Sequence, residues 1–253
     1  MEEQIKYRQI YIDLWHNGRD RAPRGLPTKE LENYHINFFQ EHQFINYACR
    51  NLNLDYIKTE LKWYLNGDCK DLSICDHAKI WQNCVTDGTL FSNYGHYIFK
   101  LHGLLKCAEI LTKDPDSRQA RISIFNSHDH LFEGNKDVPC TVGLGFRIRD
   151  GKLNMTVHMR SQDAVFGLGN DLPFFNFVWE VLAVYLGVPQ GTYHHFVESF
   201  HVYERHYEMV RNIVYGDDFK LITRPRVVLS EANSLILGKK PETHTAFTEW
   251  LWG

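Results

Sequence analysis

The chain has 253 residues, of which 43% are hydrophobic and 14% aromatic, so it can bury one sizeable core. A formal net charge of -3 excludes an overall basic field for a polynucleotide or an anionic membrane, and any anionic substrate must be bound by local arginines. The six cysteines lack CxxC spacing, and no segment has the profile of a signal peptide or membrane span, so we expect a single domain over 1–253 in the cytoplasm.

The first predicted element is a helix that begins near Asp55. Apolar residues recur from there to Leu65 at helical spacing, and Gly67 follows where a helix would stop. Glu60 lies on this predicted helix. A glutamate on a helix is most often solvated, so Glu60 becomes a candidate for chemistry only through its neighbours.

Two segments near the middle of the chain, 121–125 and 153–159, alternate polar and apolar residues and are predicted to be strands. Asp150 and Gly151 suit a two-residue hairpin turn, because both central positions of that turn need a positive φ. We therefore expect a β-hairpin over 143–160.

A strongly apolar stretch, 172–186, predicts a central buried helix with Pro173 at its first position and Gly187 at its end. A further strand is predicted at 196–203. The residues on one face of this strand are Val197, Ser199, His201 and Tyr203. Together the elements predict an α+β fold, in which a mixed β-sheet packs with helices around the central helix.

Cys140 lies just before the predicted hairpin, where a thiol can be both held and exposed. A single cysteine is more often a buried small hydrophobe than a nucleophile. Arginines on the neighbouring strands, at 118, 121 and 160, are expected to bring positive charge near the sulfur and to lower its pKa toward neutrality.

Several motifs, in their order and spacing, resemble those of thymidylate synthase. They are 60–65; Ile80 and Trp81 with 93–95; 114–118; Pro139 and Cys140; 159–163 with Gly167, Asn170 and Asp171; and 201–203 with His206. These landmarks span most of the chain, and an ordered set is far more specific than any one motif. The resemblance implies a thymidylate synthase-like fold and a homodimer that forms through a face of the sheet.

Within this superfamily the chain more closely resembles the bacteriophage deoxycytidylate 5-hydroxymethyltransferases. Thr141 follows the cysteine where synthases carry histidine, and Met159 stands where they carry glutamine. Asn170 and Asp171 replace their phenylalanine-asparagine pair. The resemblance therefore implies a phage-type enzyme of nucleotide biosynthesis, which would act in the host cytoplasm.

The aspartate at 171 has a physical meaning for base selection. One asparagine amide satisfies uracil, which accepts at O4 and donates at N3. Cytosine reverses both groups, and a carboxyl that shares a proton can accept from the 4-amino group and donate to N3. Asp171 is therefore expected to select cytosine. The alternative is that Asp171 merely caps the helix predicted from 172.

The resemblance implies a reaction in which the Cys140 thiolate adds to C6 of the pyrimidine and activates C5. The cofactor is 5,10-methylenetetrahydrofolate, and water addition then gives 5-hydroxymethyl-dCMP, whereas hydride transfer would give a methyl group. Open alternatives are a thymidylate synthase, a dUMP hydroxymethylase, and a CMP hydroxymethylase of nucleoside-antibiotic biosynthesis. An inert nucleotide-binding protein is the alternative that is not an enzyme.

The resemblance also assigns roles to individual residues. The implied catalytic residues are Cys140, Glu60, Tyr94 and Asp171. The implied nucleotide ligands are Arg24, Arg118, Arg160, Ser161, Gln162, Asp163, Asp171, His201 and Tyr203. The implied folate contacts are Trp81, Asp163 and Gly167, with 248–253 as a lid. Glu60 would organise water and protons at the base, and His201 and Tyr203 would hold the sugar 3′-hydroxyl.

Phosphate binding is the least complete part of the implied site. Arg118 is expected to reach across the dimer interface, but Gln119 stands where the family has a second arginine, and Arg121 is the expected substitute. Arg21 is the alternative to Arg24. The histidines show no zinc-ligand spacing with carboxylates or cysteines, so we expect no metal, and a pyrimidine nucleoside monophosphate is the expected partner.

Overall fold

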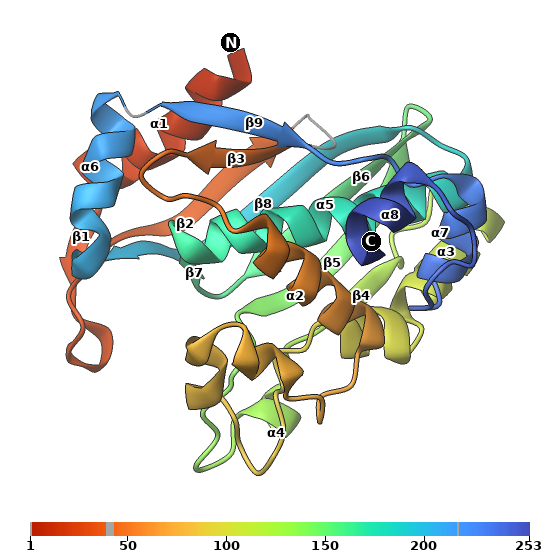
Figure 1. The fold of residues 1–253 in the computed structure, drawn as a ribbon, viewed down its shortest axis with the longest axis horizontal. Coiled ribbons are helices and arrows are strands. Elements are labelled where there is room, and N and C mark those ends of the chain that lie inside the picture. Colours follow the sequence, from red (N-terminus) through yellow and green to blue (C-terminus); the bar gives the residue numbers. More distant parts are fainter. Residues whose placement is uncertain (1, 39–42, 217) are drawn as a thin grey trace.

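The computed structural model describes residues 2–38, 43–216 and 218–253, and its largest element is a seven-stranded sheet (Figure 1). The strands are β1 (Arg19–Arg21), β2 (Thr28–Phe38), β4 (Arg121–Ser123), β5 (Thr141–Arg149), β6 (Lys152–Met159), β7 (Gln162–Asp163) and β8 (Gln190–Tyr203). Their order is β1-β2-β8-β6-β5-β4, and β7 pairs with β8. β8 runs parallel to β6 and β7, and the other pairs are antiparallel.

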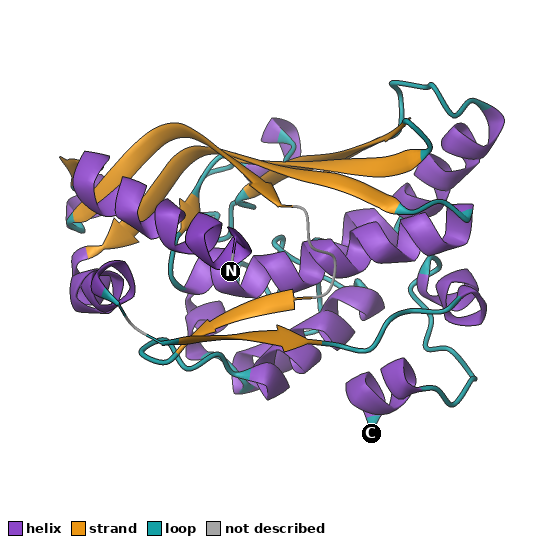
Figure 2. Ribbon diagram, turned by 90° about the horizontal axis from the view of Figure 1, so that it is seen from above, coloured by secondary structure: helices purple, strands orange, loops and turns teal. Residues whose placement is uncertain are grey.

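The long helix α5 (Phe166–Leu186) runs beneath one face of this sheet and forms the centre of the core (Figure 2). It connects the parallel strands β6 and β8, and its aromatic side chains Phe175, Phe177 and Trp179 are fully buried. The helices α2 (Leu54–Asn66), α3 (Gly103–Lys113) and α7 (Leu229–Leu235) pack against it. The predicted α+β architecture with a central buried helix is therefore confirmed.

The remaining elements surround this core. They are α1 (Glu2–Asn17), α4 (Ser127–His130), α6 (Tyr207–Tyr215), α8 (Ala246–Trp252), a two-stranded sheet of β3 (Gln43–Tyr47) and β9 (Phe219–Thr223), and the short turns η1 (Pro23–Gly25), η2 (Ser73–Asp76), η3 (Lys79–Asn83), η4 (His96–Lys100) and η5 (Glu204–His206). Across the described ranges, no helix combines the length and apolarity that a membrane crossing requires.

The local predictions for the first helix and the hairpin are confirmed. Helix α2 ends at Gly67, which has a left-handed φ of 61°. Asp150 (φ 52°) and Gly151 (φ 69°) form the turn between β5 and β6, as both positive φ values require. Strand β4 ends two residues earlier than predicted, because the amides of residues 124 and 125 both donate to the carbonyl of Val142 and interrupt the ladder.

The predicted start of the central helix is wrong. Helix α5 begins at Phe166, and Pro173 lies inside it rather than at its first position. Arg50 donates from Nε to the Val165 carbonyl (2.8 Å) and from Nη2 to Asn170 Oδ1 (2.7 Å). These long-range contacts hold the added turns in place, so tertiary structure overrides the local signal.

A buried ion pair joins α5 to the C-terminal part of the chain. Glu180 lies in α5 with 1% of its side chain exposed, and it pairs with the fully buried guanidinium of Arg224. The amide of Val227 also donates to Glu180 Oε1 (3.3 Å). Arg226 approaches the same carboxylate to 3.6 Å, but its side chain is largely exposed.

Arg224→Met is therefore expected to lower the free energy of unfolding by about 3–5 kcal/mol, because it leaves a buried carboxylate without its main counter-charge. Arg226→Met is the matched control and is expected to cost less than about 1 kcal/mol, since water screens the exposed guanidinium of Arg226. Urea denaturation of both variants measures the two values. Equal small losses would show that the Arg224 pair does not hold the C-terminal segment in place.

Candidate active site

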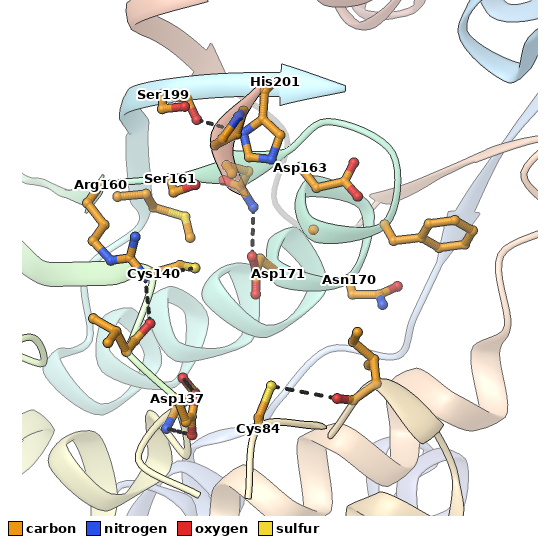
Figure 3. A pocket seen from close by; sticks show the side chains of 18 of the residues that line it. Cys84, Asp137, Cys140, Arg160, Ser161, Asp163, Asn170, Asp171, Ser199 and His201 are labelled. Atoms are coloured by element: carbon orange, nitrogen blue, oxygen red, sulfur yellow. Dashed lines mark hydrogen bonds between the residues drawn. The ribbon is translucent and has the colours of Figure 1, made fainter. Parts of the chain in front are cut away.

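A pocket of about 1160 Å³ opens between α2, the start of α5 and the adjoining ends of the sheet strands (Figure 3). All of the site residues predicted from the sequence except Arg118 line it. They are Arg24, Glu60, Trp81, Tyr94, Cys140, Arg160, Ser161, Gln162, Asp163, Gly167, Asp171, His201 and Tyr203. Motifs that are far apart in the sequence therefore face one cavity.

Cys140 is held at the start of β5 by the side chain of Arg160. The guanidinium donates to the carbonyls of Val138 (2.7 Å) and Pro139 (3.0 Å), and its Nη2 lies 3.9 Å from Cys140 Sγ. The Arg160 amide also donates to the Cys140 carbonyl (2.9 Å). In Figure 3 the sulfur lies between Arg160 and Asp171, so it faces the cavity with a cation on one side.

The predicted direction of the Cys140 pKa shift is wrong. Burial of the sulfur raises the pKa of the thiol, and this effect outweighs the positive charges of Arg160 and Arg24, which lower it. Arg118 and Arg121 lie outside the pocket lining. The thiol is therefore protonated near neutral pH in the free protein.

Glu60 is buried, with 6% of the residue exposed, and this excludes the solvated position that is usual for a helical glutamate. Desolvation raises the pKa of its carboxyl to about 7. Tyr56, one turn earlier on α2, donates to Glu60 Oε1 (2.7 Å), and Trp81 Nε1 donates to the Tyr56 hydroxyl (2.9 Å). Glu60 is therefore poised to exchange a proton near neutral pH.

Tyr56→Phe is expected to raise the pKa of Glu60 above its present value, because the hydrogen bond from Tyr56 stabilises the ionised carboxylate. If ionised Glu60 is the active form, the acid limb of the pH profile of kcat/KM moves to higher pH. The variant then loses more activity at pH 6.5 than at pH 8.5. A profile with an unchanged acid limb would remove Glu60 from proton transfer.

Asp171 is not a helix cap, because it lies inside α5 and the helix begins five residues earlier. Burial and the nearby charge of Glu60 hold the pKa of the Asp171 carboxyl well above its usual range. Gln162 Nε2 donates to Asp171 Oδ2 (2.7 Å). Asp171 therefore lies on the wall of the cavity as a hydrogen-bonded carboxyl whose surroundings favour its protonated form.

The side chain of Tyr94 is also buried on the wall of the cavity. Its ring stacks on Tyr64 with a centroid distance of 5.4 Å, and desolvation raises the pKa of the phenol well above its usual range. The Thr141 side chain has the opposite, smaller effect on that pKa. The Tyr94 hydroxyl therefore keeps its proton and can donate a hydrogen bond into the cavity.

His201 and Tyr203 project from the end of β8 into the same cavity. His201 Nδ1 is 3.2 Å from the backbone carbonyl of Ser199, which can only accept, so Nδ1 carries the proton. Its Nε2 is then an acceptor in the neutral ring. The Tyr203 ring meets the His201 ring edge-on at 5.1 Å. The pair can therefore bind a hydroxyl group.

The arginines at the pocket differ in how they are engaged. Arg21 Nε is 3.5 Å from Glu30 and its Nη2 is 3.1 Å from Glu32. Arg24 is exposed in the η1 turn with a left-handed φ of 54°, and no ion pair involves it within the described part of the chain. Arg24 is thus the better candidate for an anionic ligand. Arg118 is exposed and lies outside the lining.

The outer part of the pocket has the properties of a site for a flat aromatic group. Trp81 lies there, and large apolar side chains of Ile80 (65% exposed), Leu131 (62%) and Phe166 (44%) remain uncovered around it. Asp163 Oδ1 accepts from the Val165 amide (2.8 Å) at the start of α5. This part of the pocket can therefore pack against a flat aromatic group.

The tail 248–253, which is predicted to act as a lid, contributes no residue to the lining of the pocket in this structure. The tail belongs to α8, whose Phe247 and Leu251 are buried one turn apart. The Phe247 ring stacks on Phe177 of α5 at 5.8 Å. The apolar face that suggested a lid is therefore part of the core.

Sequence reasoning missed three residues that organise the site. Tyr56 is detectable in principle, because it precedes Glu60 by four positions on one helix face. Arg50 and His195 carry no local signal. Arg50 orients the Asn170 side chain from a distant turn, and His195 contacts Gln162 from inside the sheet.

Comparisons with known proteins agree with this geometry. A family model described as thymidylate synthase matches residues 5–238. The deoxycytidylate 5-hydroxymethyltransferase of Enterobacteria phage T4 is 34% identical over 221 residues, which are 80% of this chain and 87% of that protein. The deoxyuridylate hydroxymethyltransferase of Bacillus phage SP01 is 31% identical over 219 residues, which are 78% of this chain. The match spans 57% of the length of the SP01 protein.

Proposed function

The chain belongs to the thymidylate synthase family, and we propose from this premise that it hydroxymethylates C5 of a pyrimidine nucleoside monophosphate, with dCMP as the preferred substrate. The family consists of one-carbon transferases. The observation that carries the proposal is the carboxyl of Asp171 in the same cavity as Cys140, where Gln162 Nε2 donates to its Oδ2 (2.7 Å) and the surroundings raise its pKa. The names of the phage relatives support the hydroxymethyl product.

Base selection follows from the hydrogen-bonding groups that Asp171 presents. A protonated carboxyl offers one donor and one acceptor, which match N3 and the 4-amino group of cytosine when the oxygen that faces N3 carries the proton. A base that does not match leaves polar groups of the base and of Asp171 unpaired inside the cavity. Each unpaired buried polar group costs about 1–3 kcal/mol, and this cost rejects the wrong base.

Other side chains of the cavity bind the rest of the nucleotide. Arg24, Arg160 and Ser161 form its cationic and polar end and bind the phosphate, for which forked guanidinium donors are well suited. His201 Nε2 accepts from the sugar 3′-hydroxyl, and Tyr203 adds a second polar contact. This arrangement sets the pyrimidine between Cys140 and Asp171.

Cys140 supplies the nucleophile. Its thiolate adds to C6 of the pyrimidine, and the electron pair of the C5–C6 double bond moves to C5, which becomes nucleophilic. Arg160, 3.9 Å from the sulfur, stabilises the thiolate as it forms. C5 uses this pair to bond the one-carbon unit and then loses its hydrogen as a proton. After water has added to that unit, the pair left at C5 re-forms the C5–C6 double bond and the sulfur leaves C6, so Cys140 is regenerated.

The outer pocket with Trp81, Asp163 and Gly167 fits 5,10-methylenetetrahydrofolate, because it combines a polar edge with uncovered apolar side chains such as Ile80. When bound there, the folate supplies the one-carbon unit to C5. The hydroxymethyl group needs no reductant, since water provides its oxygen.

Glu60 holds and deprotonates that water. A carboxyl with a pKa of about 7 exists in both forms at neutral pH, so it can take up the proton that water loses and release it again within the cycle. The network of Glu60, Tyr56 and Trp81 joins the water position to the proposed folate site. Proton transfer by Glu60 near the pyrimidine is thereby linked to the contact between Trp81 and the folate.

The proposed assembly is a homodimer that forms through the face of the large sheet opposite α5. In Figure 2 this face is largely free of helices within the described residues. It carries exposed side chains, among them Phe196, which is 42% exposed. Arg118 lies outside the pocket of its own chain and would contribute to the phosphate site of the partner.

A mechanism-based adduct tests the proposed chemistry. With 5-fluoro-dCMP and methylenetetrahydrofolate, the covalent complex on Cys140 is expected to persist, because fluorine cannot leave C5 as a cation. Intact-protein mass spectrometry should then show a bound nucleotide on the wild type and none on Cys140→Ser. An unmodified wild-type protein after this treatment would favour an inert nucleotide-binding protein.

A further inference from the structure

A chain of buried hydrogen bonds runs from Asp171 into the centre of the protein. Gln162 Nε2 donates to Asp171 Oδ2 (2.7 Å), and Gln162 Oε1 contacts His195 Nε2. His195 Nδ1 is 2.7 Å from the Tyr193 hydroxyl. All of the inner groups are buried, and neither His195 nor Tyr193 lines the pocket.

Three elements meet to form this chain. Gln162 comes from β7, Asp171 from α5, and Tyr193 and His195 point to the same side of β8 because they are two residues apart. The parallel pairing of β7 with β8 and the crossover helix α5 fix these groups relative to one another. Their geometry is therefore set by the core of the fold.

The hydrogen bonds have one direction. The amide nitrogen of Gln162 faces Asp171, so its carbonyl oxygen faces His195 and must accept a proton from Nε2. Burial lowers the pKa of His195 to about 3, so the neutral ring has one proton and Nδ1 is an acceptor. Tyr193, whose phenol pKa is raised by burial, donates to it.

This direction matters because a protonated carboxyl can pair with either cytosine or uracil, depending on which oxygen carries the proton. Its hydroxyl and carbonyl oxygens can pair with N3 and the 4-amino group of cytosine. If the proton moves to the other oxygen, the same group can pair with N3 and O4 of uracil. Protonation of Asp171 therefore does not select cytosine by itself, and something has to determine which oxygen carries the proton.

We propose that the chain of Tyr193, His195 and Gln162 fixes the proton of Asp171 on Oδ1 and so sets the preference for cytosine over uracil. Oδ2 accepts from Gln162 and from the 4-amino group, and Oδ1 donates to N3. The inference rests on the proposed function. His195 and Tyr193 are positioning residues, since they act through Gln162.

A matched pair of variants at 195 tests the proposal. His195→Leu removes the donor to Gln162, which frees the amide to turn, and the ratio of kcat/KM for dCMP to that for dUMP is expected to fall about 10–100-fold. His195→Gln keeps a donor at a comparable reach, and the ratio should stay within about threefold of the wild type. Tyr193→Phe, which keeps the ring, should lower the ratio by a smaller factor.

Dissociation constants for dCMP and dUMP, measured by calorimetry on the same proteins, separate this inference from the proposed function. A wild type that prefers dCMP in binding but forms no product would contradict the function, and loss of that preference in His195→Leu would still support the positioning chain. Equal weakening of both nucleotides in His195→Leu, with no rescue by His195→Gln, would show that the chain only packs the core.

Discussion

Cys140→Ser is expected to lower the turnover of dCMP by at least about 10⁴-fold while the fold remains intact. A serine hydroxyl is a much weaker nucleophile than a thiolate, and Arg160 cannot compensate, because it stabilises the thiolate charge from 3.9 Å without supplying a base. Product formation is measured by chromatography, and the fold by circular dichroism and the midpoint of urea denaturation.

Cys84→Ser is the matched control for this variant. Cys84 lines the same pocket and donates to the carbonyl of Ile80 (3.6 Å), a bond that serine can also make. Activity of Cys84→Ser is expected to stay within about threefold of the wild type. Retention of activity in Cys140→Ser, or equal losses in both variants, would contradict covalent catalysis by Cys140.

Asp171→Asn has the second large expected effect. With its nitrogen toward O4 and its oxygen toward N3, the amide satisfies uracil but presents a donor to the 4-amino group of cytosine. This orientation requires the Gln162 amide to turn, so that its oxygen accepts from the new amide nitrogen. The ratio of kcat/KM for dCMP to that for dUMP is therefore expected to fall by about 10²–10⁴-fold, with the buried, mispaired polar groups as the cause.

Asp171→Asn is expected to leave the free energy of unfolding nearly unchanged, because aspartate and asparagine have nearly the same volume and Gln162 can pair with either. Steady-state kinetics with both nucleotides measure the ratio, and urea denaturation provides the control. An unchanged preference for dCMP in Asp171→Asn would remove base selection from this residue.

The parts of the fold that depend on local sequence could be predicted. Helix α2 and the β5–β6 hairpin follow from hydrophobic spacing and from glycine at positions that need a positive φ, Gly67 and Gly151. The start of α5 could not be predicted, because Arg50 stabilises it from more than a hundred residues away in the sequence. Long-range contacts leave no local pattern.

The pocket could be predicted residue by residue only because an ordered set of motifs resembles a known family. From composition and spacing alone, Glu60 would be a solvated surface residue and Asp171 a helix cap. Burial gives both side chains the chemistry of a site, since it raises the pKa of both carboxyls. The Cys140 prediction failed for the same reason, as desolvation outweighs the arginines there.

In the most direct measurement, the purified protein is incubated with methylenetetrahydrofolate and one nucleotide in each of three reactions, with dCMP, CMP or dUMP. The mass of each nucleotide product is then determined by mass spectrometry. A gain of one hydroxymethyl group, greatest on dCMP and without formation of dihydrofolate, is the predicted result. A methyl gain on dUMP with dihydrofolate formed would make the protein a thymidylate synthase and contradict cytosine selection by Asp171.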